Sequence, residues 1–368
     1  MGRLILVVVL LTACGSVVPR AATVTPSPSP AATSQPPPTP SRSDFLAIVG
    51  GPKNTSVSLV ASDGTVVATA PVDLPAFWMH TQMSWTSASR TRLYYLDGSE
   101  VRFLAPDGST GLATKIALGP TEQPGFAVSP DDASIAVSVF SYTLVSGPPA
   151  SATYKGMRLY VEDLHGGGHH VDIFSSTTVA EFPIGWTSGR LILAVSGPNC
   201  CRARTINPYD ATSYHVVDPA TGTRLASLCE VGAGPEGPVE PAGVICMKTE
   251  PEFLRWDASH FLAPAAISDP TPFLNALSPD GTRVAGSQGQ ASIRIWGPRG
   301  SGGAIEESGY VVGWLDNDRI VFEQLTNHAL SVAKIVPGVT STRLWDVGAI
   351  AEIAGGGVYL GTFPAAVT

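Results

Sequence analysis

Short apolar runs separated by tight turns dominate the chain from residue 44 onward. Two of these runs end at a Ser-Pro-Asp motif, Ser129–Asp131 and Ser278–Asp280, and a second apolar run follows each motif closely. Proline presets the backbone angle φ for the second position of a tight turn, and Asp or Gly tolerates the next positions. Each copy therefore predicts a β-hairpin, and we call it the landmark turn. Apolar residues at helical spacing are not sustained over three turns, so the pattern predicts an all-β fold.

The landmark turn recurs along the chain. Five positions align with its opening residue, and they are Thr86, Ser129, Thr187, Ser278 and Leu315. The interval from Thr187 to Ser278 is about twice as long as the others, which predicts a degenerate copy near Val239 to Gly243. The average spacing lies within the range of propeller blades, roughly 40–50 residues. Strand–turn–strand runs in the second half of each unit favour seven units, and six or eight remain alternatives.

Four-stranded units at this spacing, with pieces of a Trp-Ser-Pro-Asp-Gly signature, resemble the TolB-like and WD40-like β-propellers. The resemblance covers nearly all of residues 44–368 and implies a single propeller of four-stranded blades. Because the chain enters this region in the middle of a unit, Phe45–Val49 is predicted to be a second strand. Either Ala349–Glu352 or Val358–Phe363 is expected to supply the inner strand beside it and close the ring. Trp85, Trp186 and Trp314 share one repeat position and are predicted to pack on inner strands.

The first residues have the pattern of a secretory signal. A basic start is followed by eight apolar residues from Leu4 to Leu11, whereas a membrane-spanning helix needs about 20. The sequence Leu11-Thr12-Ala13-Cys14 resembles the lipobox of bacterial lipoproteins. This resemblance implies cleavage after residue 13, lipidation of Cys14 and an extracytoplasmic, membrane-anchored place in the bacterial cell envelope. An ordinary secretory signal with an incidental Cys14 is the alternative.

Residues 14–43 are predicted to be a disordered linker behind the lipidated cysteine. From Ser16 to Ser43 the segment is rich in Pro, Ser, Thr and Ala, and it has no aromatic and no acidic residue. Such a composition cannot bury enough surface to offset its ordering entropy. The net charge of −8 argues against nucleic acid as a partner, which would require a basic surface. We expect a monomer without a cofactor.

Four further cysteines are Cys200, Cys201, Cys229 and Cys246. An even number in an oxidising compartment predicts two disulfides, with three connectivities open. A zinc site is disfavoured because the adjacent Cys200-Cys201 pair lacks the Cys-x-x-Cys spacing. In the strand assignment, all four thiols fall on one face of the ring.

The longest predicted insertions lie on the same face, and the first of them runs from Ser141 to Gly156. Binding residues of scaffold proteins concentrate on such loops, so we expect a binding surface there. Its candidate residues are Tyr142, Tyr154, Arg202, Arg204 and Tyr209.

Three other motifs are assigned no chemistry. His165–His170 contains three histidines but also three glycines, and it is expected to be a flexible hairpin tip without a metal. Gly232–Gly237 matches a dinucleotide fingerprint by chance, since no helix follows it. Asp316–Asp318 is better explained as a polar turn than as a calcium loop.

The sequence favours a binding or scaffold protein for an envelope protein or glycan. The alternative is a propeller enzyme of the lactonase or the sugar or quinone dehydrogenase type, with acidic side chains at the central channel. Inner strands such as Phe126–Val128 and Val311–Trp314 are nearly all apolar, so no catalytic residue is assigned. The degenerate landmark near Val239 to Gly243, flanked by Cys229 and Cys246, is where we expect function to be found.

Overall fold

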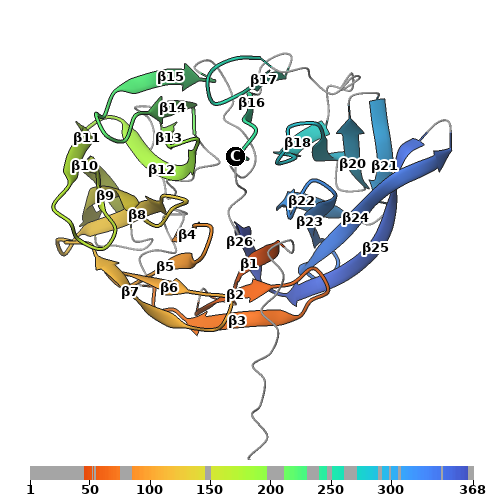
Figure 1. The fold of residues 1–368 in the computed structure, drawn as a ribbon, viewed down its shortest axis with the longest axis horizontal. Coiled ribbons are helices and arrows are strands. Elements are labelled where there is room, and N and C mark those ends of the chain that lie inside the picture. Colours follow the sequence, from red (N-terminus) through yellow and green to blue (C-terminus); the bar gives the residue numbers. More distant parts are fainter. Residues whose placement is uncertain are drawn as a thin grey trace, which may run out of the picture. The chain divides into compact units, whose positions relative to one another are not determined.

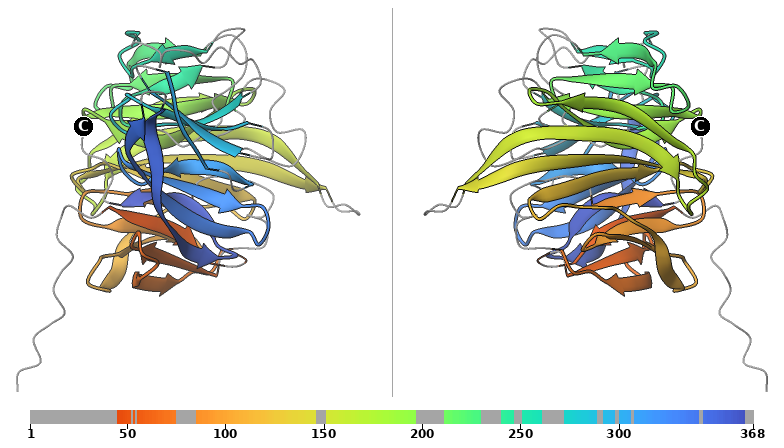
Figure 2. Two further views of the ribbon diagram at one scale, coloured as in Figure 1. Left: turned by 90° about the vertical axis from the view of Figure 1, so that its right-hand side faces the viewer. Right: turned by 90° about the vertical axis from the view of Figure 1, so that its left-hand side faces the viewer.

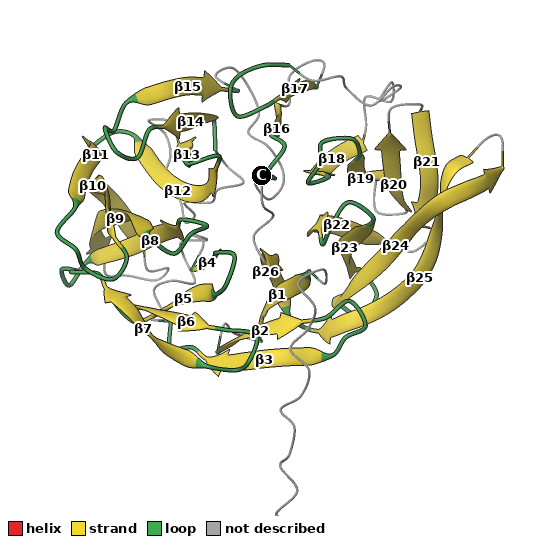
Figure 3. Ribbon diagram, viewed as in Figure 1, coloured by secondary structure: helices red, strands yellow, loops and turns green. Residues whose placement is uncertain are grey.

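The computed structural model describes residues 45–51, 53, 55–74, 85–145, 151–196, 211–229, 240–246, 251–260, 272–288, 292–297, 300–305, 308–340 and 343–363. All of them belong to the unit Thr39–Thr368, and only this unit is described. Its regular elements are strands, and the described residues contain no α-helix (Figure 3), as the short apolar runs predicted. None of the described segments is therefore a helix of the length and apolar character needed to cross a bilayer.

The described strands form seven antiparallel sheets, numbered here in chain order (Figure 1). Sheet one has the order β26 (Val358–Phe363), β1 (Leu46–Gly50), β2 (Ser56–Val60), β3 (Val66–Pro71). Sheet two has β4 (Thr86–Ala88), β5 (Leu93–Asp97), β6 (Glu100–Leu104), β7 (Thr110–Lys115). Sheet three has β8 (Glu122–Val128), β9 (Ser134–Val145), β10 (Ser151–Asp163), β11 (His170–Ser176).

The remaining sheets follow the same up-and-down order. Sheet four has β12 (Ala180–Thr187), β13 (Arg190–Ser196), β14 (Ser213–Val217), β15 (Arg224–Leu228). Sheet five has β16 (Val244–Cys246) and β17 (Glu252–Leu254). Sheet six has β18 (Pro272–Leu277), β19 (Val284–Gln288), β20 (Ser292–Gly297), β21 (Gly300–Ile305). Sheet seven has β22 (Gly309–Trp314), β23 (Arg319–Gln324), β24 (Ala329–Thr340), β25 (Arg343–Gly355).

Successive sheets pack side by side into a ring (Figures 1 and 2). Strand β4 contacts β26 and β8, β8 contacts β12, β18 contacts β16 and β22, and β22 contacts β26. Sheets four and five meet where the Tyr214 ring packs edge-on against Trp256, with centroids 5.9 Å apart. The architecture is a β-propeller, and β8, β12, β18 and β22 are the inner strands that the sequence predicted. The number of blades stays a prediction, since only two strands of sheet five are described.

Sheet one joins the two ends of the propeller. Strand β26 pairs antiparallel with β1, from Leu46 opposite Phe363 to Gly50 opposite Val358. This confirms that Val358–Phe363 supplies the inner strand and closes the ring. The alternative strand, Ala349–Glu352, is wrong, because these residues lie in β25 at the outer edge of sheet seven. Strand β25 is 13 residues long and pairs with β24 as far as Gly355, so it includes these residues.

The two clearest landmark turns have matching hydrogen bonds. In each turn, the hydroxyl of the opening serine donates to the carboxylate of the Asp two residues later. The distance is 2.6 Å from Ser129 Oγ to Asp131 Oδ1 and 2.7 Å from Ser278 Oγ to Asp280 Oδ1. The same serine oxygen accepts a main-chain N–H five residues on, at 2.9 Å in both copies. The fourth position has positive φ, 62° at Asp132 and 73° at Gly281, which explains the preference for Asp or Gly there. The repeated motif therefore forms the hairpin turn that it predicted.

The tryptophans of two inner strands join neighbouring sheets. Trp186 Nε1 donates to the Ala127 carbonyl oxygen at 3.1 Å, and Trp314 Nε1 donates to the Ala276 carbonyl oxygen at the same distance. Each bond runs from one inner strand to the inner strand of the preceding sheet. Trp85, at the equivalent position before β4, is buried like Trp314, whereas Trp186 is half-buried. These contacts confirm the predicted packing role and satisfy the indole N–H groups inside the ring.

Candidate functional site

Two of the predicted binding residues, Tyr142 and Tyr154, do not lie in a loop. Strands β9 and β10 extend into the region, place these residues opposite each other and project beyond the neighbouring strands (Figure 2). Their rings meet edge-on with centroids 6.3 Å apart, and Tyr142 is only 5% exposed. The Tyr154 hydroxyl donates to the carbonyl oxygens of Ser176 and Val179, and burial raises the pKa of Tyr154 to about 12.

The loop assignment for Tyr142 and Tyr154 is therefore wrong. Both residues pack near the tip of the β9–β10 hairpin, because strand alternation directs the two rings to its buried side. The other three candidates, Arg202, Arg204 and Tyr209, lie outside the described residues, so the binding role of that face stays a prediction.

One pair of the predicted cysteine set forms a disulfide. Cys229, directly after β15, is bonded to Cys246 at the end of β16, with Cα atoms 5.1 Å apart. The bond ties sheet four to sheet five. Cys200 and Cys201 lie outside the described part of the chain, and so does Cys14.

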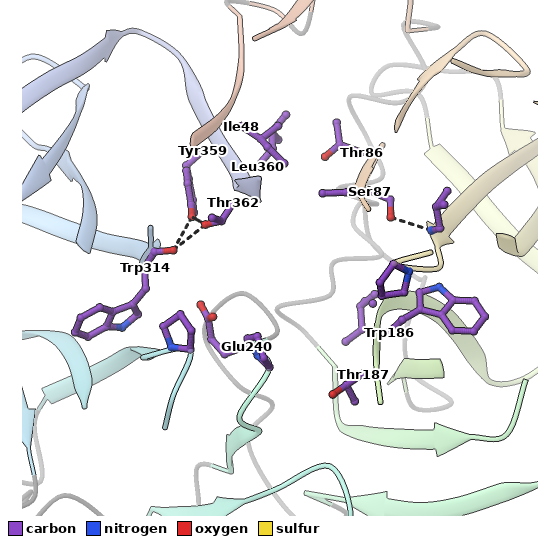
Figure 4. A pocket seen from close by; sticks show the side chains of 18 of the residues that line it. Ile48, Thr86, Ser87, Trp186, Thr187, Glu240, Trp314, Tyr359, Leu360 and Thr362 are labelled. Atoms are coloured by element: carbon purple, nitrogen blue, oxygen red, sulfur yellow. Dashed lines mark hydrogen bonds between the residues drawn. The ribbon is translucent and has the colours of Figure 1, made fainter. Parts of the chain in front are cut away.

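The inner strands surround a central cavity of about 210 Å³ (Figure 4). Its apolar wall includes Ile48, Phe126, Val128, Ile184 and Leu360. Hydroxyl groups of Thr86, Ser87, Thr187, Tyr359 and Thr362 also line it. Pro130 and Pro279 bring the landmark turns of sheets three and six to its edge. Apolar walls with a few polar groups are typical of small-molecule and side-chain recognition sites, and this cavity is smaller than the roughly 300 Å³ of the smallest drug-sized pockets.

Glu240 introduces a carboxyl group into this cavity. The segment Glu240-Pro241-Ala242-Gly243 aligns with Ser278-Pro279-Asp280-Gly281, so Glu replaces the opening Ser of the landmark. Gly243 N–H donates to the Glu240 carbonyl oxygen at 3.2 Å, just as Gly281 N–H donates to that of Ser278 at 2.8 Å. This confirms the degenerate landmark that the sequence predicted between Val239 and Gly243. The sequence pattern did not single out the glutamate itself.

The Glu240 side chain is directed into the cavity and is 8% exposed (Figure 4). The fold uses only its main chain, whose carbonyl oxygen accepts from Trp256 Nε1 at 2.8 Å. Within the described residues, the carboxyl group forms neither a hydrogen bond nor an ion pair. Burial alone raises its pKa well above the usual value for a glutamate. Glu240 is therefore a carboxyl group for which the described structure supplies no counter-ion.

Two hydroxyl groups of the cavity wall are fixed on β26. Tyr359 Oη and Thr362 Oγ1 are 2.6 Å apart, and both contact the Trp314 carbonyl oxygen, at 3.1 and 2.8 Å. Because the carbonyl oxygen can only accept, at least one of the two hydroxyl groups donates to it, and two hydrogens are shared among the three contacts. The pair is therefore a fixed polar group on the cavity wall.

The histidine motif lies away from the cavity. Leu164–His169 connects β10 to β11, which confirms the predicted turn, and His170 lies 3.5 Å from Glu162 and 3.3 Å from Asp172. Asp316–Asp318 likewise lies in the turn between β22 and β23. The described residues contain no cluster of three His, Cys, Asp or Glu side chains able to hold a metal ion. Gly232–Gly237 lies outside the described ranges.

Comparison with known proteins adds only structural likeness. No protein-family description and no curated protein sequence matches this chain. Hsv2 of Kluyveromyces lactis is similar at 10% identity and a TM-score of 0.44, over 84% of this chain and 95% of that one. BamB of Moraxella catarrhalis is similar at 11% identity and a TM-score of 0.38, over 78% of this chain and 92% of that one. Apo AztD of Citrobacter koseri is similar at 12% identity and a TM-score of 0.45, over 85% of this chain and 83% of that one. At these values no function is carried over.

Replacing Glu240 with Gln is expected to stabilise the protein at pH 8 by about 1–3 kcal/mol, because an amide removes a buried ionisable group without a partner. A raised folded-state pKa means that the wild type loses stability as the pH rises above the usual glutamate value. The difference in unfolding free energy between the variant and the wild type should therefore vanish near pH 4, where the carboxyl group is protonated in both the folded and the unfolded state. Urea unfolding at several pH values measures it.

Glu122→Gln is the matched control, because its effect on stability is expected to be opposite to that of Glu240→Gln. The hydrogen bond from Arg158, 2.7 Å long, holds the Glu122 pKa below its usual value, so its stabilising effect is present at neutral pH and lost as the pH falls. This variant should be less stable than wild type at pH 8. If Glu240→Gln behaved like Glu122→Gln, the carboxyl group of Glu240 would have a stabilising partner and our description of the cavity would be wrong.

Proposed function

We propose that this chain is a lipid-anchored extracytoplasmic binding protein, in which the propeller holds an envelope protein or glycan partner. Support for the binding role comes from the central cavity, where apolar walls, hydroxyl groups and one carboxyl group form a recess for recognition. Support for the anchor comes from the Leu11–Cys14 sequence, and the Pro-rich residues behind it would carry the ring away from the bilayer. A lipid anchor and a spacer together suit a protein that meets its partner near a membrane.

The alternative is a propeller enzyme with its site in the same cavity. Such an enzyme would have to use Glu240, because it is the single carboxylate among the described lining residues. A raised glutamate pKa is a property of general acids, which is the one observation that favours this alternative. Turnover of a lactone or sugar substrate by the wild type, lost in Glu240→Gln, would favour the enzyme over the binding protein.

Site-specific photocrosslinking on intact cells of the source organism tests the binding role. A photoreactive residue at Ala88, on the cavity wall, is compared with one at Leu112, which is 53% exposed on the outer strand β7. We expect Ala88 to give a defined protein or glycan product that Leu112 does not give, identified by mass spectrometry. The same products at both sites, or none at Ala88, would reject binding at the cavity. Cys14→Ser should release the chain from the membrane fraction, and continued membrane association would reject the anchor.

A further inference from the structure

The position of Glu240 in the landmark turn shows that the fold does not require its carboxyl group. Ser278 and Ser129 occupy the equivalent position, and their hydroxyls are used within their own turns. In the degenerate copy, the turn keeps its main-chain bond from Gly243 but has no side-chain bond from Glu240. The longer side chain passes beyond the turn into the cavity (Figure 4). A group that destabilises the folded state without serving the turn is better explained by a ligand.

The polar groups of the cavity define the chemistry of that ligand. The hydroxyl oxygens of Tyr359 and Thr362 contact each other and the Trp314 carbonyl oxygen, and a hydroxyl oxygen can also accept a hydrogen bond. Burial raises the pKa of Glu240 and so favours its protonated form, and a bound cation would shift it back to the carboxylate. The carboxylate is negatively charged and has no hydrogen to donate, so the ligand that matches it is a donor with a positive charge. No lysine or arginine is among the described lining residues of the cavity.

The size and walls of the cavity narrow the choice further. A cavity of about 210 Å³ admits a small ion or one side chain, not a drug-sized molecule. A bare Ca²⁺ or Mg²⁺ would require at least about six oxygen ligands around it. The described residues of the cavity supply only one carboxylate, that of Glu240. Apolar wall residues such as Ile48, Phe126 and Leu360 fit an alkyl stem. An ammonium head has three donors and no acceptor, which suits the Glu240 carboxylate and the hydroxyl oxygens of β26 as acceptors.

We propose that the central cavity binds a primary alkylammonium group, with the carboxylate of Glu240 as its counter-ion and the β26 hydroxyl oxygens as further acceptors. This rests on the proposed binding function and names the chemistry that the propeller recognises. Two sources carry this group, a free alkylamine and a lysine side chain presented by a partner protein. The ammonium head lies between Glu240 and the Tyr359–Thr362 pair, and the stem lies along the apolar wall.

Isothermal titration of the full chain with four probes tests the proposal. The cations are n-pentylammonium and the blocked tripeptide acetyl-Ala-Lys-Ala-amide, and the neutral controls are n-pentanol and the matching norleucine tripeptide. We expect at least one cation to bind and both neutral controls to fail at the same concentrations. Glu240→Gln should weaken the binding by at least about tenfold. A stronger signal from the peptide identifies a partner's lysine as the source, and a signal from n-pentylammonium alone identifies a small amine.

Two results would overturn the proposal. The first is that neither cation binds the wild type at millimolar concentration, and the second is equal binding to wild type and Glu240→Gln. Near-UV circular dichroism checks that the variant is folded. If it is not, Glu240→Asp, which keeps the charge on a shorter side chain, must weaken binding of both cations, and unchanged binding would overturn the proposal. The crosslink from Ala88 requires no amine probe, so its persistence without amine binding would reject this inference alone.

Discussion

A chain truncated after Gly357 is expected to lose its cooperative unfolding transition. Strand β26 is the inner strand of sheet one, although the rest of that sheet comes from the start of the described chain. Truncation removes the buried Tyr359 and Phe363 and leaves one edge of β1 unpaired. Burial of one large apolar side chain contributes about 1.5–3 kcal/mol, whereas whole domains are stable by only about 5–15 kcal/mol. The open ring would also expose strand edges that favour aggregation.

Two substitutions within β26 test the same point without truncation. Phe363 is 4% exposed, so Phe363→Ala should lower the unfolding free energy by about 3–5 kcal/mol. Val358, at the other end of the strand, is 54% exposed, and Val358→Ala should change it by less than about 0.5 kcal/mol. Denaturant unfolding followed by tryptophan fluorescence measures both. Equal effects of the two substitutions would show that β26 does not close the ring as described.

The second large effect is expected when the Cys229–Cys246 disulfide is removed. The bond closes a loop over a sequence separation of 17, and a loop of this length corresponds to about 3 kcal/mol of stability. The two described strands of sheet five have three residues each, so the covalent link to sheet four holds a sheet with few hydrogen bonds of its own. The double variant Cys229→Ser/Cys246→Ser should therefore unfold about 5–10 °C below the wild type.

Thermal unfolding with and without dithiothreitol provides the control. Reduction should lower the melting temperature of the wild type at least as far as the double substitution does. Any further loss on reducing the double variant reports on Cys200 and Cys201, which that variant retains. A double variant as stable as the oxidised wild type would contradict the contribution assigned to this bond.

Much of the fold could be predicted because its signals are local and repeated. The Ser-Pro-Asp turns have their bonding partners within five residues, so the motif at Ser129 and Ser278 determines its own geometry. Counting strands in a repeat predicted that a C-terminal strand closes the ring, but it left Ala349–Glu352 and Val358–Phe363 as alternatives. Tyr142 and Tyr154 were misplaced because the loop length was judged from the turn signals alone. Their burial depends on strands that continue past those signals.

The candidate site was harder to predict, because its parts are distant in the sequence. The degenerate landmark could be located from its spacing, and function was expected where the repeat fails. The cavity, however, is formed by inner strands of nearly every described sheet, so the surroundings of Glu240 depend on the closed ring. A usable signal was present in the sequence. Glu240 occupies a landmark position where Ser129 and Ser278 serve the turn, and a long acidic side chain there has no local partner.

The titration of Glu240 tests the central claim most directly. The claim is that its carboxyl group is buried in the central cavity to receive a cation. Carbon-13 NMR of protein labelled at the glutamate carboxyl carbons follows it, with Glu240→Gln to assign the signal. We expect this signal to titrate well above the usual glutamate pKa, and to shift to lower pH when n-pentylammonium is added, since a bound cation favours the ionised form. A signal that titrates at the usual value and does not respond to the amine would contradict the account.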